Sequence, residues 1–539
     1  MLNLNKIKSN KNFCLHNKKY FNKTHSCKDA EILVEFNSFH ASHIPFSYLS
    51  NCLSNIFKCK ITAFYNYSLI TSSLNPTILE KFKWHIANIL NLKTFKIYRS
   101  FGAKKIFRPF KFENYITQQN LQNLKKKINT KKKLLSLKID NIKIGDLIYD
   151  TYLKRYQKPT IDFKDKKFHE LFIDFIHLYF FWKMYLKVNK VKAVIGNHSV
   201  YSFGLILRIA IEKNIPTFVA SNRFIYRLSK KMKYMHGQFK NYAEEFKKLD
   251  QQTRLKGINL AKKRLSLRFS GVGGAKVDLI TSQNSSFKNI NHKRLIKKNN
   301  KIKVLITPHD FFDAAHIWGN MLFTDFYEWL VFLGKISKKT DYDWYIKNRP
   351  DHPGKFKKYQ PHTNQILKNI SAKYPKLNIL PNNYSHNQII SEGIDFVLTC
   401  YGSVGMEYAY FKIPVINASY NNPHISYKFN INPRSIKDYK NILLKLNKYK
   451  FFKKKINKDE VIQYYFMRHL FLEKNWLIED LNKMLKKVGG YDNQWSYHFY
   501  NYWLNNFNKN SHNNIKSSLI KFINSKENYY SILHNTKNC

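Results

Sequence analysis

The segment over residues 397–417 constrains the fold of this chain more than any other. It reads as an apolar strand, a turn of small residues, a short helix and a second apolar strand. This order is typical of a βαβ unit in a parallel sheet. In the turn, Gly402, Ser403 and Gly405 let a ligand approach the backbone, and a helix that starts near Val404 directs unpaired N–H groups at the same point. We therefore expect an anion to bind at this turn.

Glu407 follows one helical turn later and suggests which anion this is. A carboxylate at this distance can accept hydrogen bonds from the two hydroxyls of a ribose. The anion-binding turn and this carboxylate together therefore predict a nucleotide, as part of a nucleotide-sugar. The alternative is an ordinary buried βαβ unit, in which the glycines only permit tight packing and Glu407 is a surface residue. Short glycine patterns are shared by many proteins, so both interpretations stay open on this segment alone.

Two further strands of the same half end in polar loops. The strand near residue 344 runs into a loop that carries three cations, and the strand near residue 377 ends in a loop of amides and hydroxyls. Loops at the carboxyl ends of neighbouring parallel strands line one crevice, which is where open α/β sheets bind ligands. The candidate binding residues in these loops are Lys347, Arg349, His352, Asn383 and Ser385.

The order of these motifs resembles the donor-binding half of GT-B glycosyltransferases. It runs Lys-x-x-x-x-His-Pro, Pro-Asn-x-x-Ser, Gly-Ser-x-Gly-x-Glu and Lys-x-Pro-Val-Ile over about residues 300–420, with a weaker likeness over 30–230. It is most similar to the capsular polysaccharide biosynthesis family, which includes the Kdo transferases of capsule assembly. The resemblance implies that His352, Ser403 and Glu407 hold the phosphate and nucleotide of the donor, and it favours a CMP-sugar. Here the family's Lys-Pro-His-Pro loop is expanded, and the turn lacks the usual Thr/Ser pair.

Alternating strand and helix patterns divide the chain into two halves. We expect strands at 31–36, 60–65, 94–98 and 191–195, and the pattern restarts with a strand at 304–307 after a stretch rich in Lys and Asn. The predicted organisation is a basic N-terminal tail over 1–29, an N-terminal Rossmann-like acceptor domain over 30–283, a linker over 284–303, a C-terminal Rossmann-like nucleotide-sugar domain over 304–440 and a helical C-terminal extension over 441–539. The predicted fold class is α/β with GT-B architecture, two Rossmann-like domains facing a cleft.

Glycosyl transfer requires two chemical tasks. Cations and a helix N-terminus can neutralise a departing nucleotide phosphate without a metal, and a carboxylate or imidazole of the N-terminal domain can activate the acceptor hydroxyl. The loop after the strand at 304–307 should overhang the cleft and position donor and acceptor. It could instead be an ordinary polar loop at a domain junction. The candidate catalytic residues are His198, Glu35, Asp146, His309 and Asp310.

Metal and cofactor are not expected. Asp341 and Asp343 match the Asp-x-Asp motif of metal-dependent GT-A enzymes, but they precede a strand and are interpreted as a turn. The six cysteines show no paired metal-ligand spacing. The nucleotide-sugar is a substrate, so no separate cofactor is predicted.

The balance of 93 Lys and Arg against 35 Asp and Glu gives a formal charge of +58. Such a charge suggests nucleic acid or another anionic partner. The lysines are spread through nearly every segment together with Asn, Ile, Phe and Tyr, a pattern typical of an AT-rich coding sequence. We therefore favour compositional drift. Attraction to anionic lipid, to a polyanionic acceptor or to the donor's phosphates remains open.

Location and function follow from these observations as expectations. The lysine-rich N-terminus lacks the apolar core of a secretory signal, and no uninterrupted apolar run is long enough to span a membrane. We expect a cytoplasmic protein, with any membrane contact peripheral at the inner face. The predicted function is transfer of a sugar from a nucleotide-sugar to a capsule or other surface polysaccharide, free or lipid-linked. The alternatives are a CDP-glycerol-type polyol-phosphate transferase and a non-enzymatic basic nucleic-acid-binding protein.

Overall fold

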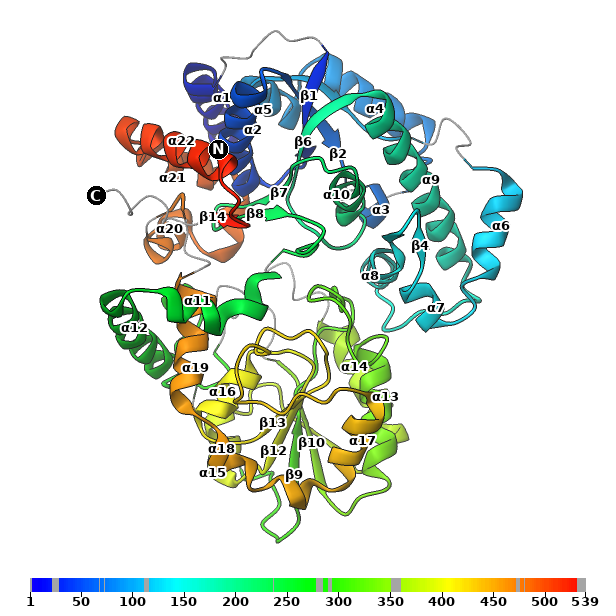
Figure 1. Ribbon diagram of the computed structural model, residues 1–539, viewed down its shortest axis with the longest axis vertical. Coiled ribbons are helices and arrows are strands. Elements are labelled where there is room, and N and C mark those ends of the chain that lie inside the picture. The colour runs from blue at the N-terminus through cyan, green and yellow to red at the C-terminus, as the bar shows by residue number, and fades with distance from the viewer. Residues whose placement is uncertain are drawn as a thin grey trace. The chain divides into compact units, whose positions relative to one another are not determined.

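The computed structural model divides the chain into two compact units, each described by itself. The first unit contains Met1–Tyr156, Ile161–Met235 and Lys474–Cys539, and the second contains Gln157–Thr160 and His236–Glu473. The structure describes residues 2–21, 29–66, 68–71, 73–110, 116–235, 237–277, 285–288, 293–349, 360–471, 476–478 and 480–530. Figure 1 labels the helices and strands.

The first unit is built on a seven-stranded sheet in the order β14-β8-β7-β6-β1-β2-β3, in which β3, β2, β1, β6 and β7 are parallel. Strand β1 is buried along its whole length, as expected for a parallel strand covered on both faces. The strands are β1 Ala30–Phe36, β2 Lys60–Tyr65, β3 Ala103–Phe107, β6 Lys190–Gly196, β7 Thr217–Ala220, β8 Ile225–Leu228 and β14 Tyr529–Tyr530, and a separate hairpin joins β4 Lys138–Ile139 to β5 Ile142–Lys143.

Helices cover both faces of this sheet. Helix α2 packs on β1, β2, β6 and β7, whereas α9 and α10 pack from the other side, where Leu33 and Val194 join their apolar core (Figure 1). The helices are α1 Leu2–Phe21, α2 His40–Phe57, α3 Ser68–Thr71, α4 Ile78–Ile89, α5 Thr94–Ser100, α6 Gln118–Lys126, α7 Lys131–Leu135, α8 Gly145–Tyr156, α9 Lys166–Val188, α10 Phe203–Glu212, α20 Leu481–Val488, α21 Tyr497–Asn505 and α22 Lys509–Asn524.

The second unit holds a five-stranded, fully parallel sheet in the order β11-β10-β9-β12-β13. Its strands are β9 Lys303–Ile306, β10 Asp343–Lys347, β11 Leu377–Leu380, β12 Phe396–Thr399 and β13 Val415–Asn417. Its helices are α11 Tyr242–Lys248, α12 Gln251–Phe269, α13 Phe326–Ser337, α14 Gln360–Lys373, α15 His386–Glu392, α16 Val404–Tyr410, α17 Ile436–Leu444, α18 Phe452–Lys455 and α19 Lys458–Tyr465. One unit with a mainly parallel sheet and one with a fully parallel sheet confirm the predicted α/β class.

The observed boundaries differ from the expected ones because side chains far apart in sequence pack together. The chain leaves the first unit at Met235, not near residue 284, because α12 packs its Gly257 against Phe466 of the second unit. The described part of the expected linker is also anchored, since Ile296 is buried in the same core as Leu305. The extension over 441–539 is divided, with residues from 474 onward in the first unit, where β14 pairs with β8.

Two local expectations also change at the N-terminal end. The basic tail over 1–29 contains a helix, α1, which packs against α5 and α21 and buries Phe13 and Phe21. Residues 94–98, expected as a strand, form helix α5, because Phe95 and Tyr98 lie one helical turn apart and both are buried. The third strand of the parallel run is β3 instead.

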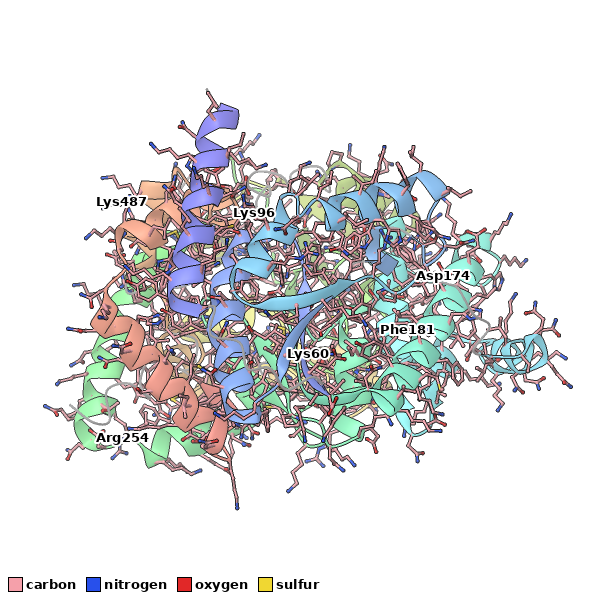
Figure 2. The ribbon with its side chains drawn as sticks, turned by 90° about the horizontal axis from the view of Figure 1, so that it is seen from above. Lys60, Lys96, Asp174, Phe181, Arg254 and Lys487 are labelled. Atoms are coloured by element: carbon pink, nitrogen blue, oxygen red, sulfur yellow. The ribbon has the colours of Figure 1, made fainter. Side chains whose placement is uncertain are left out.

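Basic residues occur in elements of both units. Figure 2 shows nitrogen-tipped side chains on all sides of the view, with Lys96, Arg254 and Lys487 among the labelled residues. Among the described residues, no helix combines the length and the apolar character needed to span a bilayer.

Candidate functional site

The candidate site of the second unit lies at the carboxyl edge of its sheet. Strands β10, β9 and β12 are adjacent and parallel, so the loops that follow them emerge at the same edge. The β9 loop brings His309, the β10 loop brings Arg349, and the β12 loop brings the turn over residues 400–403. A built Cβ on Gly402 would lie 3.6 Å from Cε1 of His309, so the first and third loops touch.

The imidazole of His309 is held at this edge with a defined tautomer. Its ring stacks on Phe326 at 4.7 Å and lies 4.5 Å from the ring of Tyr401. Its Nε2 accepts a hydrogen bond from the backbone N–H of Tyr401 at 3.4 Å, and Thr399 Oγ1 lies 3.3 Å away. Burial lowers the pKa of His309 to about 3, with a further lowering from Arg349. The ring is therefore neutral at pH 7, and Nδ1 carries its proton.

The Nδ1–H group of His309 is the side of the ring available to a ligand. Within the described residues no acceptor bonds to this nitrogen, and the side chain is half-exposed. A neutral imidazole that accepts through one nitrogen and presents N–H through the other can donate to a phosphate or sugar oxygen.

Charged groups surround this N–H. Arg349, at the end of β10, acts electrostatically on His309, and Asp310 and Asp313 of the β9 loop act on Arg349. Arg349 is exposed, and its backbone N–H is fixed by the side chain of Asn348 at 2.9 Å. The structure thus brings together three predicted residues from two loops, His309 and Asp310 after β9 and Arg349 after β10.

The turn after β12 adds backbone donors. Ser403 is exposed at the start of α16, and the N–H groups of Gly405, Met406 and Glu407 already donate to carbonyls of Gly402 and Ser403. No hydrogen bond to another described residue uses the N–H groups of Ser403 and Val404. Gly402 donates to Thr399 Oγ1 at 3.2 Å, which fixes the turn beside His309.

Four predicted binding residues have partners within the protein, and their role in binding stays a prediction. Lys347 is 2% exposed, and its ammonium donates to the carbonyls of Asn348 and Asn382 at 2.6 and 2.8 Å. Ser385 is buried and caps α15 by accepting from the N–H of Asn387. A Cβ on Gly405 would lie 2.5 Å from the ring of His424, so this glycine serves close packing.

Glu407 is the fourth of these residues. Its carboxylate is 1% exposed and pairs with Arg268 of α12, with Oε1 at 3.0 Å from Nη2 and 3.1 Å from Nε. A carboxylate buried in this way does not present itself to a ribose. Asn383 is exposed in the β11 loop, and His352 lies outside the described residues.

The first unit gathers polar groups at the carboxyl ends of three adjacent strands. Glu35 near the end of β1 accepts hydrogen bonds from the backbone N–H of Asn197 at 3.0 Å and from Nδ2 of Asn37 at 3.3 Å. Burial raises the pKa of Glu35 to about 7, and hydrogen bonds from Asn197, Asn37 and Asn66 oppose this rise. Each asparagine directly follows a strand, namely β1, β2 or β6.

Glu35 itself is fully buried, so it does not face an acceptor directly. Through Asn197 it fixes the loop that carries His198, which is half-exposed. Asp146, predicted as a catalytic carboxylate, is buried in α8 and pairs through both oxygens with Arg208 at 2.6 and 2.7 Å. An acid engaged on both oxygens has the geometry of a structural ion pair, and its catalytic role stays a prediction.

Several residues that contact the predicted site residues were not predicted from the sequence. Arg268 lies in a lysine-rich helix, where no pattern distinguishes it from its solvated neighbours. The asparagines 37, 66 and 197 did carry a signal, because each one is the first residue after a parallel strand. That position repeated three times would have pointed to a polar cluster.

The acidic pair Asp341 and Asp343 lies at the opposite, amino end of β10. Asp341 pairs with Lys301, and Asp343 accepts from Asn299 at 2.8 Å. Asp341 lies two residues before the strand, and Asp343 is the first residue of β10. Among the described residues, no group of three or more His, Cys, Asp or Glu side chains is arranged to hold a metal ion.

No protein-family model and no curated protein sequence matches the chain. Several solved structures align with the chain. The beta Kdo 2,4 transferase KpsC of Thermosulfurimonas dismutans aligns over 51% of this chain and 79% of its own, with 10% identity and a TM-score of 0.31. A glycosyltransferase of Rickettsia africae ESF-5 aligns over 89% and 100%, with 12% identity and a TM-score of 0.23.

A UDP-GlcNAc 2-epimerase of Neisseria meningitidis, bound to UDP-GlcNAc, aligns over 81% of this chain and 97% of its own, with 8% identity and a TM-score of 0.23. Identities of 8–12% and TM-scores of 0.23–0.31 do not extend the activity of these proteins to this chain.

Proposed function

We propose that this protein is a glycosyltransferase that takes a sugar from a nucleotide-sugar donor and passes it to a saccharide acceptor. One observation carries the proposal. At the carboxyl edge of the second unit's sheet, the neutral imidazole of His309 presents an N–H beside the cation Arg349 and beside the backbone donors of the turn at Ser403.

This group of donors suits a diphosphate or phosphodiester. Arg349 supplies the positive charge that a departing nucleotide phosphate needs, because a guanidinium binds phosphate oxygens through several N–H groups. His309 and the N–H groups of Ser403 and Val404 add uncharged donors that can follow the charge as it grows on the leaving oxygen. Asp310 and Asp313 are close enough to Arg349 to act on its charge, and we assign them to orienting it.

For the acceptor hydroxyl we propose His198 of the first unit as the activating base. It is half-exposed, directly after the carboxyl end of β6, and Glu35 fixes the preceding residue. An imidazole can take a proton from a hydroxyl through an unprotonated ring nitrogen, which suits it to the role of a general base. Glu35 is a positioning residue in this scheme, and Asp146 and Glu407 have no part in it.

The identities of the substrates rest on the sequence resemblance. It favours a CMP-sugar as donor and a capsule or other surface polysaccharide as acceptor. A CDP-glycerol-type polyol-phosphate transferase is the nearest alternative, but it normally carries an acidic residue after a serine-rich turn, and residues 401–405 lack one.

The test is a thermal-shift screen with CMP, UDP, GDP, their sugars and CDP-glycerol, followed by a transfer assay with oligosaccharide acceptors. A ligand that binds the folded state raises the unfolding temperature. We expect one nucleotide class to do so, and Arg349→Ala and His309→Phe to reduce the effect. Lys335→Ala is the matched control, because α13 runs back from the carboxyl edge and places this residue at the other edge. Equal shifts in all variants, or stabilisation by CDP-glycerol alone, would overturn the proposal.

A further inference from the structure

Helix α4 has an apolar face that the rest of the protein leaves exposed. None of its residues is buried, although half of them are large and apolar. Ile78 is 86% exposed and Ile89 is 80% exposed. A single exposed leucine or isoleucine on a soluble protein needs no explanation, but several of them on one helix do. The α4 stripe consists of Ile78, Leu79, Phe82, Ile86, Ile89 and Leu90, all exposed.

These six side chains lie on one side of the helix. With 100° per residue, their positions fall within about a third of the helix circumference. The opposite side holds the helix to the protein. Trp84 packs against the rings of Phe36, Tyr65 and Phe95 at 4.9 to 5.4 Å. Asn88 donates to the carbonyl of Ile106 in β3 at 3.1 Å.

The helix is also formed without help from a partner. Thr77 and Glu80 make a reciprocal capping box, in which each side chain accepts from the backbone N–H of the other residue. The stripe is therefore presented by an anchored helix. Its exposure does not come from a helix that has yet to fold.

The surrounding charge indicates what the stripe faces. Over residues 73–110 the only acidic residue is Glu80, whose carboxylate is used in the cap. Exposed lysines lie on α4 itself, on the following helix and on the edge strand β3, and Lys96 is labelled in Figure 2. The basic residues of this segment are Lys81, Lys83, Lys93, Lys96, Arg99, Lys104, Lys105 and Arg108.

We propose that α4 docks this protein on an anionic lipid bilayer, with the stripe in the headgroup region and the neighbouring lysines on lipid phosphates. An amphipathic helix of Ile, Leu and Phe flanked by lysines is suited to this position. A second copy of the chain suits the stripe less well, because each copy carries +58 and brings the same basic segment to the contact. The proposal is independent of the proposed reaction.

The experiment is co-sedimentation of the full chain with vesicles of equal parts phosphatidylglycerol and phosphatidylcholine. We expect Phe82→Ser/Ile89→Ser to reduce the partition coefficient by about tenfold or more. The matched control is Leu255→Ser/Leu260→Ser, which removes exposed leucines of 58% and 42% from α12 and should leave binding unchanged. Lys83→Gln/Lys96→Gln should weaken binding chiefly at low salt.

The outcomes separate the alternatives. Because the substituted side chains are exposed, the thermal midpoint should be the same in all variants, which excludes unfolding as the cause. Equal binding of both serine double variants would overturn the proposal, since charge alone would then explain the binding. It would also be overturned if the chain ignored the vesicles but formed a dimer that Phe82→Ser/Ile89→Ser abolished.

Discussion

The guanidinium of Arg268 lies 3.0 Å from the carboxylate of Glu407, with both side chains at most 3% exposed. The pair joins α12 to α16 within the second unit, beneath the turn that we propose as the phosphate site. It helps to hold α12 in this unit, because neither charge could stay buried without the other.

Glu407→Gln should therefore act on stability and much less on nucleotide binding. Breaking a buried pair from one side costs about 3–5 kcal/mol, because the remaining charge is left uncompensated. Urea unfolding followed by circular dichroism measures the loss. Replacing both partners in Arg268→Met/Glu407→Leu should recover much of it. A stable Glu407→Gln variant that loses affinity for ribonucleotides but keeps it for 2′-deoxy analogues would restore the ribose-binding assignment.

The pKa of Glu35 near 7 predicts how stability depends on pH. The folded state holds this proton more tightly than the unfolded chain, whose carboxyl has an ordinary pKa of 4.5. The resulting contribution, about 3 kcal/mol, is fully present below pH 4.5 and is lost as the pH rises through 7. Glu35→Gln should flatten this part of the curve of unfolding free energy against pH. Glu170→Gln, at an exposed position of α9, should leave the curve unchanged.

The phosphate site predicts two binding losses of different size. Arg349→Ala removes a charged donor and should weaken nucleotide binding by roughly 1.5–3 kcal/mol. His309→Phe keeps the stacking on Phe326 but removes the N–H, for a loss of about 1 kcal/mol. Isothermal titration measures both. Unchanged affinity in the two variants would show that the nucleotide binds elsewhere.

The two glycines of the turn should respond differently to alanine. In Gly405→Ala the new methyl group would lie 2.5 Å from the ring of His424, a buried neighbour, so we expect a stability loss of roughly 1–3 kcal/mol. In Gly402→Ala the nearest atom is Thr399 Oγ1 at 3.0 Å, and the loss should be smaller. Comparing their thermal midpoints tests this order. If Gly402→Ala were the less stable variant, the assignment of packing to Gly405 alone would be wrong.

The positions of the strands could be read from the sequence because local pattern is sufficient for a buried parallel strand. Runs such as residues 31–36, 191–195 and 396–399 are mainly apolar and are followed by polar or small residues. The same reasoning failed at residues 94–98. A five-residue segment that mixes apolar and polar residues fits a strand or a helix, and the neighbours that bury Phe95 and Tyr98 decided for the helix.

The sequence by itself determined that two α/β units each carry a parallel sheet, and which loops lie at a carboxyl edge, because both follow from the order of apolar and polar residues along the chain. Only the tertiary structure decided how deeply each charged side chain is buried. Arg349 is exposed, whereas Lys347, Asp146 and Glu407 are buried and engaged with carbonyls, Arg208 and Arg268. A charge looks the same in a sequence whether solvent or a buried partner satisfies it, and the partners here come from elements distant in the chain.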